Sequence, residues 1–226
     1  MKRLRGEARY HWHVPAELRT AFHRDMERID QQVVELFAMV RECVAGATAA
    51  FLAGDRAAAS ALCARDQLID SLYLDVEELV QRQLTLQSPM AHDLRFLLSV
   101  LRIVPELERS GDLAEHIAQR GARGIAAELS PRIRGLVDQM GRVGVELWQG
   151  ATAAYVDKDG GAAERLRARD DDLDDLHVSI STELASGNVR VPVAMEMALV
   201  ARFYERLGDH AVNIAARIRY LATGGF

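Results

Sequence analysis

An internal duplication constrains the fold of this 226-residue chain more than any other sequence feature. The segment Gly46-Ala-Thr-Ala-Ala-Phe51 matches Gly150-Ala-Thr-Ala-Ala-Tyr155, at a separation of 104 residues. Asp66 and Asp170, each preceded by Ala-Arg, match at the same separation. A chain with such matches is predicted to contain two copies of one supersecondary unit.

A second repeated motif indicates that the two copies differ in length. Glu108-Arg-Ser-Gly-Asp112 has a near copy at Glu205-Arg-Leu-Gly-Asp209, at the smaller separation of 97 residues. We therefore expect the loop between the second and third helices of the second copy to be shorter than its counterpart in the first.

Apolar residues recur at intervals of three and four along most of the chain, which is typical of amphipathic helices. Ser88 and Pro89, and likewise Ser130 and Pro131, have the residue types that favour a helix N-cap and first turn. Gly54 and Asp55 are expected to end the first helix. Six helices are predicted, at about residues 17–53, 56–86, 89–128, 131–157, 160–185 and 191–221.

These patterns predict an all-α fold of two duplicated three-helix bundles related by a pseudo-twofold axis. The first repeat is expected at residues 17–129 and the second at 130–226. Residues 1–16 lack any apolar period and are expected to form an irregular N-terminal extension.

Composition excludes several functional classes. The net charge of −5 argues against a nucleic-acid binder. The longest apolar run, Phe96–Val104, contains Arg102 and is far shorter than a membrane span, so no span is expected. The N-terminus lacks the apolar core of a signal peptide. Cys43 and Cys63 lack metal-site spacing, so we expect reduced core thiols and a cytosolic setting.

The duplication also repeats a set of acidic pairs. Each pair has a spacing of four residues, which places both carboxylates on one face of a helix. In each copy, a side chain four residues after the last acid extends the same face. The candidate ligands are Asp66, Asp70, Glu108, Asp112 and His116 in the first copy, and Asp170, Asp174, Glu205, Asp209 and Asn213 in the second.

Asp66 and Asp170 fall within apolar helix stripes, where an uncompensated carboxylate is costly. A multivalent cation would relieve the repulsion among the grouped acids. Carboxylate, amide and imidazole ligands favour iron, manganese or magnesium, possibly in a multinuclear site. The alternative is neutralisation by arginines that adjoin the acids, namely Arg65, Arg109, Arg169 and Arg206.

Glycine is unfavourable inside a helix, so Gly111 and Gly208 are expected to permit close helix approach beside the acids. No nucleophile–base pair or phosphate-binding loop is evident, which favours a protein that is not an enzyme. Two alternatives remain, a carboxylate-bridged metalloenzyme of helical-bundle type and a metal-free helical scaffold.

The sequence resembles the PhoU family of bacterial phosphate-uptake regulators. The resemblance rests on the repeated Glu-Arg-x-Gly-Asp motif, on Ser88-Pro89-Met90-Ala91 with Asp93-Leu94-Arg95 before its first copy, and on Gly208-Asp209-His-Ala-Val-Asn213 at its second copy. It covers nearly everything after about Ala16. His116 departs from the pattern by standing where the second copy has Asn213.

The resemblance implies a cytoplasmic, often homodimeric protein that binds metal clusters on its acidic faces. It implies association with the ATPase subunit of the phosphate ABC transporter and with the sensor histidine kinase of the phosphate response, and hence a peripheral location at the inner face of the membrane. It also implies that the protein represses the phosphate-starvation response when phosphate is plentiful. One metal site would use the acids of the first copy and the other site those of the second.

Overall fold

The computed structural model describes residues 16–87 and 89–225. The described residues form helices only, which confirms the predicted all-α class. The expected N-terminal extension lies outside the described residues, apart from Ala16, which begins the first helix. The elements are α1 (Ala16–Ala53), α2 (Arg56–Gln87), α3 (Ala91–Ala122), η1 (Ile125–Glu128), α4 (Pro131–Asp157), α5 (Ala162–Ala185) and α6 (Val191–Thr223).

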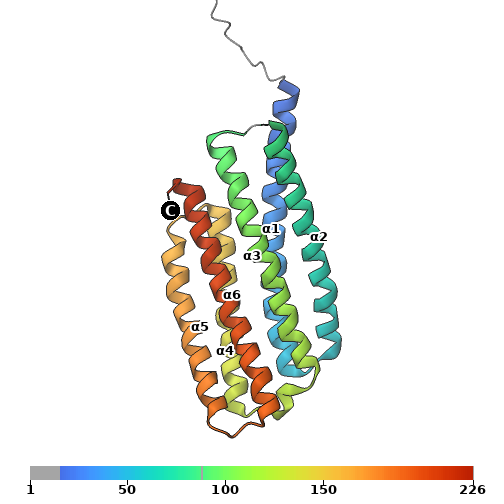
Figure 1. The fold of residues 1–226 in the computed structure, drawn as a ribbon, viewed down its shortest axis with the longest axis vertical. Coiled ribbons are helices and arrows are strands. Elements are labelled where there is room, and N and C mark those ends of the chain that lie inside the picture. The colour runs from blue at the N-terminus through green and yellow to red at the C-terminus, as the bar shows by residue number, and fades with distance from the viewer. Residues whose placement is uncertain (1–15, 88, 226) are drawn as a thin grey trace, which may run out of the picture.

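The helices form two three-helix units that lie side by side (Figure 1). Helices α1, α2 and α3 pack on one another, as do α4, α5 and α6. Corresponding helices then meet between the units, because α1 packs on α4 and α3 packs on α6. This pairing of equivalent helices is the arrangement that a pseudo-twofold relation requires, and it leaves α2 and α5 on the outside.

One apolar core runs through both units. Phe37 of α1 stacks against Tyr155 of α4, with ring centroids 5.2 Å apart. Polar groups cross the same boundary, since the hydroxyls of Thr48 and Tyr204 lie 2.8 Å apart and Ser110 Oγ lies 3.0 Å from His210 Nδ1. Buried polar contacts require a specific geometry, so contacts of this kind fix how the two units are positioned relative to each other.

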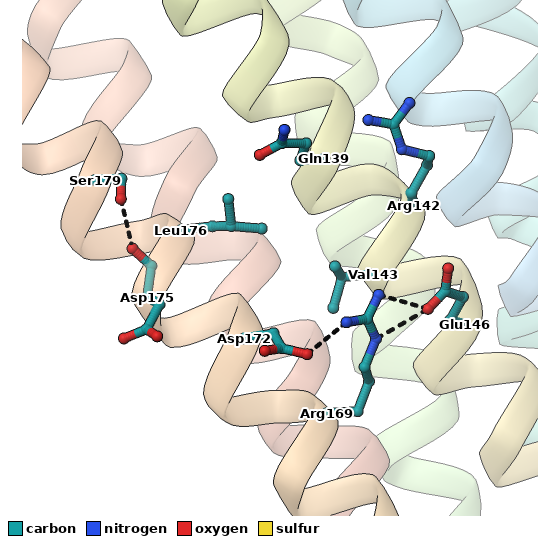
Figure 2. A pocket seen from close by; sticks show the side chains of 9 residues that line it. All are labelled: Gln139, Arg142, Val143, Glu146, Arg169, Asp172, Asp175, Leu176 and Ser179. Carbon is teal, nitrogen blue, oxygen red and sulfur yellow. Dashed lines mark hydrogen bonds and ion pairs between the residues drawn. The ribbon is translucent and has the colours of Figure 1, made fainter.

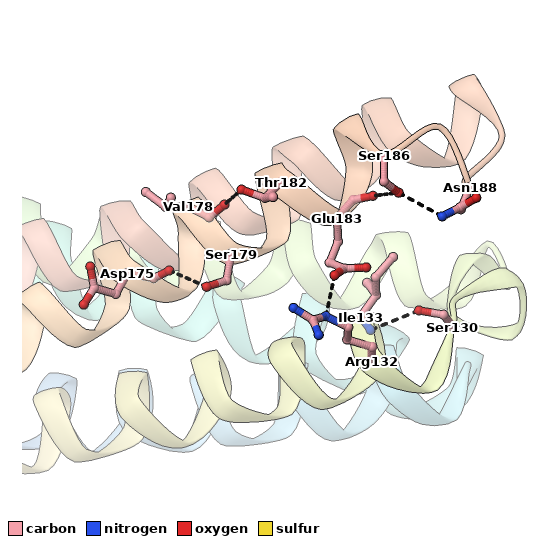
Figure 3. Close-up of polar contacts among 10 residues, drawn as sticks. All are labelled: Ser130, Arg132, Ile133, Asp175, Val178, Ser179, Thr182, Glu183, Ser186 and Asn188. Carbon is pink, nitrogen blue, oxygen red and sulfur yellow. Dashed lines mark hydrogen bonds and ion pairs between the residues drawn. The ribbon is translucent and has the colours of Figure 1, made fainter.

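Two of the expected helix boundaries have a visible cause. Gly54 has a φ of +65°, which suits glycine, and Asp55 Oδ1 accepts hydrogen bonds from the amides of Ala57 and Ala58 at the start of α2. Ser130 caps α4 by accepting from the amide of Ile133 at 3.2 Å (Figure 3). Nearby, an ion pair between Arg132 and Glu183 ties the start of α4 to the end of α5.

Three sequence predictions about boundaries and loops are wrong. The third helix begins at Ala91 with Met90 as its N-cap, so Pro89 is not in its first turn. It ends at Ala122 and not near Glu128, because Gly124 takes a φ of +79° before the short η1. The second copy is shortened in a helix and not in a loop, since α2 has 32 residues and α5 has 24.

Helix α1 bears on the question of a membrane span. In the described residues, the segment Thr20–Ala53 is long and apolar enough to cross a membrane by length and composition alone. Half of its most apolar window is buried against the other helices, and a core helix of a globular protein passes the same test. Cys43 of this helix is buried as expected, whereas Cys63 of α2 is partly exposed and is not a core thiol.

Candidate metal centre

Helices α2 and α3 bring three predicted ligands of the first copy together. One carboxylate oxygen from each of Asp66, Asp70 and Asp112 lies within 4.8 Å of the other two. Glu108 lies close by, and its pKa is raised by burial and then by the charges of Asp112 and Asp70. The i,i+4 spacing supplies two aspartates from α2, and the packing of α3 on α2 adds the third.

Glycines make room for the central aspartate of each copy. A Cβ atom added to Gly111 would lie 2.7 Å from Asp66 Oδ1, and one added to Gly208 would lie 1.9 Å from Asp170 Oδ1. Both distances are shorter than a carbon–oxygen contact allows, so each aspartate lies against the bare backbone of the neighbouring helix. The structure thereby gives the reason for the glycines that the sequence singled out.

The central aspartates carry charge that the protein compensates poorly. Burial, followed by the charges of Asp112 and Asp70, raises the pKa of Asp66 to about 7. Burial, followed by the charges of Asp174 and Asp209, raises the pKa of Asp170 to about 7. Like charges and desolvation act in the same direction here, so a cation or a proton is needed to stabilise either cluster.

Hydrogen bonding does not compensate these oxygens either. In the described part of the chain, Asp66 Oδ1, Asp70 Oδ1 and Asp170 Oδ1 are shielded from solvent and have no hydrogen-bond partner. Such atoms are rare in folded proteins and call for a specific explanation. Hard or borderline cations such as Mg²⁺, Mn²⁺ or iron take oxygen ligands of this kind, so the residues present fit a bound metal.

The two copies are unequal. Asp66 is buried in the first copy, whereas its counterpart Asp170 is partly exposed. Asp174 and Asp209 are exposed, and Glu205 forms an ion pair with Arg202. The first-copy cluster is thus the more enclosed of the two, and the second is the more open to solvent and to exchange of a bound cation.

The predicted ligands His116 and Asn213 lie toward the boundary between α3 and α6. The ring of His116 packs on that of Phe203, with centroids 5.6 Å apart. Asn213 lines a separate groove with Arg102 and Glu106. His116 does not belong to the converging group formed by the three aspartates.

Glu115 is a nearby acid that sequence reasoning missed. Burial is the largest cause of the raised pKa of Asp66 and of Asp112, and the charge of Glu115 raises the pKa of both further. The i+3 spacing from Asp112 was the available signal. The duplication hid it, because the equivalent position in the second copy is Val212.

The arginine alternative can be examined directly for two of the four arginines. Arg65 of α2 pairs with Glu42 of α1. At the equivalent position of the second copy, Arg169 of α5 pairs with Glu146 of α4 and with Asp172 (Figure 2). These arginines therefore neutralise glutamates of the first helix of each unit, and within residues 16–87 and 89–225 no ion pair involves Asp66 or Asp170.

Figure 2 also shows the cavity beside Arg169. It has a volume of about 370 Å³ and lies between α4 and α5. Among its lining residues, Arg169 contacts the carboxylates of Glu146 and Asp172, whereas Arg142 pairs with Asp138 one turn earlier on α4. Both arginines of this cavity are therefore already paired with carboxylates.

The fold and these clusters together define a duplicated six-helix protein with carboxylate-rich faces suited to cations. The chain belongs to the PhoU family. The family model described as "PhoU domain" matches residues 33–121 and 137–218. The chain is 34% identical over 212 residues to the phosphate-specific transport system accessory protein PhoU homolog 2 of Mycobacterium tuberculosis, a match that covers 92% of this chain and 100% of the relative.

Another relative and two solved structures of the PhoU family also match this chain. PhoU homolog 1 of Mycobacterium leprae is 32% identical, with 92% of this chain and 96% of the relative covered. The crystal structure of PhoU from Pseudomonas aeruginosa matches with a TM-score of 0.84 at 27% identity, covering 90% of this chain and 100% of that one. PhoU from Streptococcus pneumoniae, at 23% identity and a TM-score of 0.80, supports the fold. The family consists of accessory and regulatory proteins, so the chain is not an enzyme.

Proposed function

We propose that this protein is a metal-binding regulatory adaptor of a phosphate-specific transport system. Its relatives are named as accessory proteins of such systems. The observation that carries the metal-binding part is the cluster of Asp66, Asp70 and Asp112, whose shielded oxygens lack partners. A bound cation would supply charge neutralisation and a rigid acidic face, with no chemical step.

The adaptor role joins two partners. The proposal is that the protein associates with the ATPase subunit of the phosphate ABC transporter and with the sensor histidine kinase of the phosphate response, as a homodimer in the cytoplasm at the inner face of the membrane. When phosphate is plentiful, this association would keep the kinase from activating the starvation response. The two helical units lie side by side in Figure 1, and each carries its own set of acidic pairs, so the protein offers surfaces for more than one partner.

Metal content tests the site. Elemental analysis of the purified full chain is expected to find iron, manganese or magnesium. The Asp66→Asn, Asp112→Asn double variant is expected to lose the metal bound by the first copy, because both changes remove anionic ligands. Asp75→Asn is the matched control, since Asp75 is an exposed aspartate of α2 outside the cluster. Equal metal content in the double variant and wild type would rule out the assignment and favour a metal-free scaffold.

Regulation is tested in cells. A strain that lacks the gene is expected to express a phosphate-starvation reporter in phosphate-rich medium, and wild-type protein or the Asp75→Asn variant should restore repression. The cluster variant is expected to fail despite normal abundance. A deletion strain whose reporter still responds normally to phosphate would contradict the regulatory role.

A further inference from the structure

A basic groove at the boundary between the two units adjoins the aspartate cluster and shares Asp112 with it. It lies between α3 and α6, which run side by side in Figure 1, and encloses about 230 Å³. Its polar lining is mostly cationic, with Asp112 as the single carboxylate. The lining includes Arg109, Asp112, His116 and Arg120 of α3 and Phe203 and Arg206 of α6.

One of the three arginines is already compensated and held in place. Arg120 Nε lies 3.0 Å from a carboxylate oxygen of Glu196, and its guanidinium lies 4.7 Å from the centroid of the Phe203 ring. Arg120 also donates to the carbonyl oxygen of His116. This side chain thus forms a fixed, half-buried wall of the groove.

The other two arginines have no such partner. Arg109 and Arg206 are exposed, and among the described residues neither forms a hydrogen bond or an ion pair. They occupy the same position of the repeated Glu-Arg-x-Gly-Asp motif. The packing of α3 on α6 brings the two copies of this arginine to one groove, so each unit contributes one positive charge that has no ion-pair partner among the described residues.

The symmetry-related groove offers an internal comparison. It is lined by Arg102, Glu106, Asn213, Arg217 and Arg219. Glu106 stands there at the position that Phe203 holds in the first groove, given the separation of 97 residues. The second groove therefore contains the carboxylate of Glu106 at a position where the first groove has an aromatic ring. Among the described residues, the only carboxylate that lines the first groove is that of Asp112, which converges with Asp66 and Asp70.

We propose that the groove formed by Arg109, Arg120 and Arg206 binds a small tetrahedral oxyanion of the phosphate type. Guanidinium groups present several donors in fixed directions and bind phosphate through paired, charge-assisted hydrogen bonds. Groups from two helices can contact different oxygens of one tetrahedral anion, which a planar carboxylate allows less well. The size of the groove and the net negative charge of the chain favour a small anion over a nucleic acid.

Calorimetric titration of the full chain with inorganic phosphate tests this inference, with sulfate as a second tetrahedral anion. A chelator is present throughout, so that a bound cation cannot serve as the phosphate ligand. Wild type is expected to bind phosphate, and Arg109→Gln and Arg206→Gln are each expected to weaken binding by about tenfold or more, because each removes charge-assisted hydrogen bonds.

Arg102→Gln is the matched control, because Arg102 is an exposed α3 arginine of the symmetry-related groove. Its phosphate affinity should equal that of wild type, and circular dichroism should show unchanged helicity in all three variants. Absence of phosphate binding by wild type would overturn the inference, as would equal weakening in Arg102→Gln. The assay contains neither transporter nor kinase, so its failure would leave the proposed regulatory function standing.

Discussion

Replacement of Gly121 by alanine is expected to lower the free energy of unfolding by about 3 kcal/mol, which is large for a single added methyl group. A Cβ atom at this position would lie 2.3 Å from Phe51 Cα and 3.0 Å from the Phe51 backbone nitrogen. Because these are backbone atoms, no rotamer change relieves the overlap, and α1 and α3 must separate where they cross. Urea unfolding followed by circular dichroism measures the loss.

Gly135→Ala is the matched control. Gly135 lies within α4, and in the described structure a Cβ atom added there would meet no heavy atom within 4 Å beyond its own helix turn. Since alanine is favoured over glycine inside a helix, this variant should gain up to about 1 kcal/mol. The opposite signs of two identical substitutions would establish the close crossing of α1 and α3, and a neutral Gly121→Ala variant would contradict it.

The stability of the metal-free protein is expected to fall by about 3 kcal/mol between pH 5 and pH 8 because of Asp66 and Asp170, after allowance for screening by water. The pKa of each is raised to about 7 from an ordinary value of 3.8. The folded state therefore holds these protons more tightly than the unfolded state. Their contribution is most favourable below pH 3.8 and is lost as the pH rises toward 7. Urea unfolding in chelator at both pH values measures the change.

The Asp66→Asn, Asp170→Asn double variant isolates this effect from other titrations. Without metal, it should lose less stability between pH 5 and pH 8 than wild type, and it should be the more stable protein at pH 8. Added Mn²⁺ should reverse the order, since a ligand that binds only the folded state stabilises it and the variant lacks central ligands. A variant with the same pH dependence as wild type would show that these carboxylates are compensated within the protein.

Much of the fold could be predicted because its signals are local and repeated. Six helices follow from apolar periodicity, and the cap at Ser130 and the break at Gly54 depend on residues within one turn of the boundary. The errors arose where a local signal competed with another. Pro89 resembled a first-turn residue although the helix begins at Ala91, and the predicted third helix ran past the turn at Gly124.

The candidate site was only partly predictable. Spacing alone placed Asp66 with Asp70 on α2, but their convergence with Asp112 depends on how α3 packs against α2. The same packing brings Glu115 near Asp66, and the packing of α3 on α6 places His116 against Phe203; the helix period reveals neither contact. The pairing of Arg65 with Glu42 is likewise a contact between separate helices.

The sequence by itself determined that this chain is a duplicated helical protein with acidic pairs at matching positions, because helical periodicity and internal repeats are properties of the chain order. Only the tertiary structure decided which carboxylates converge, why Gly111 and Gly208 must lack a side chain, and that Arg109 and Arg206 face one groove. Those features arise from distances between helices, and such distances are set by the packing of side chains far apart in sequence.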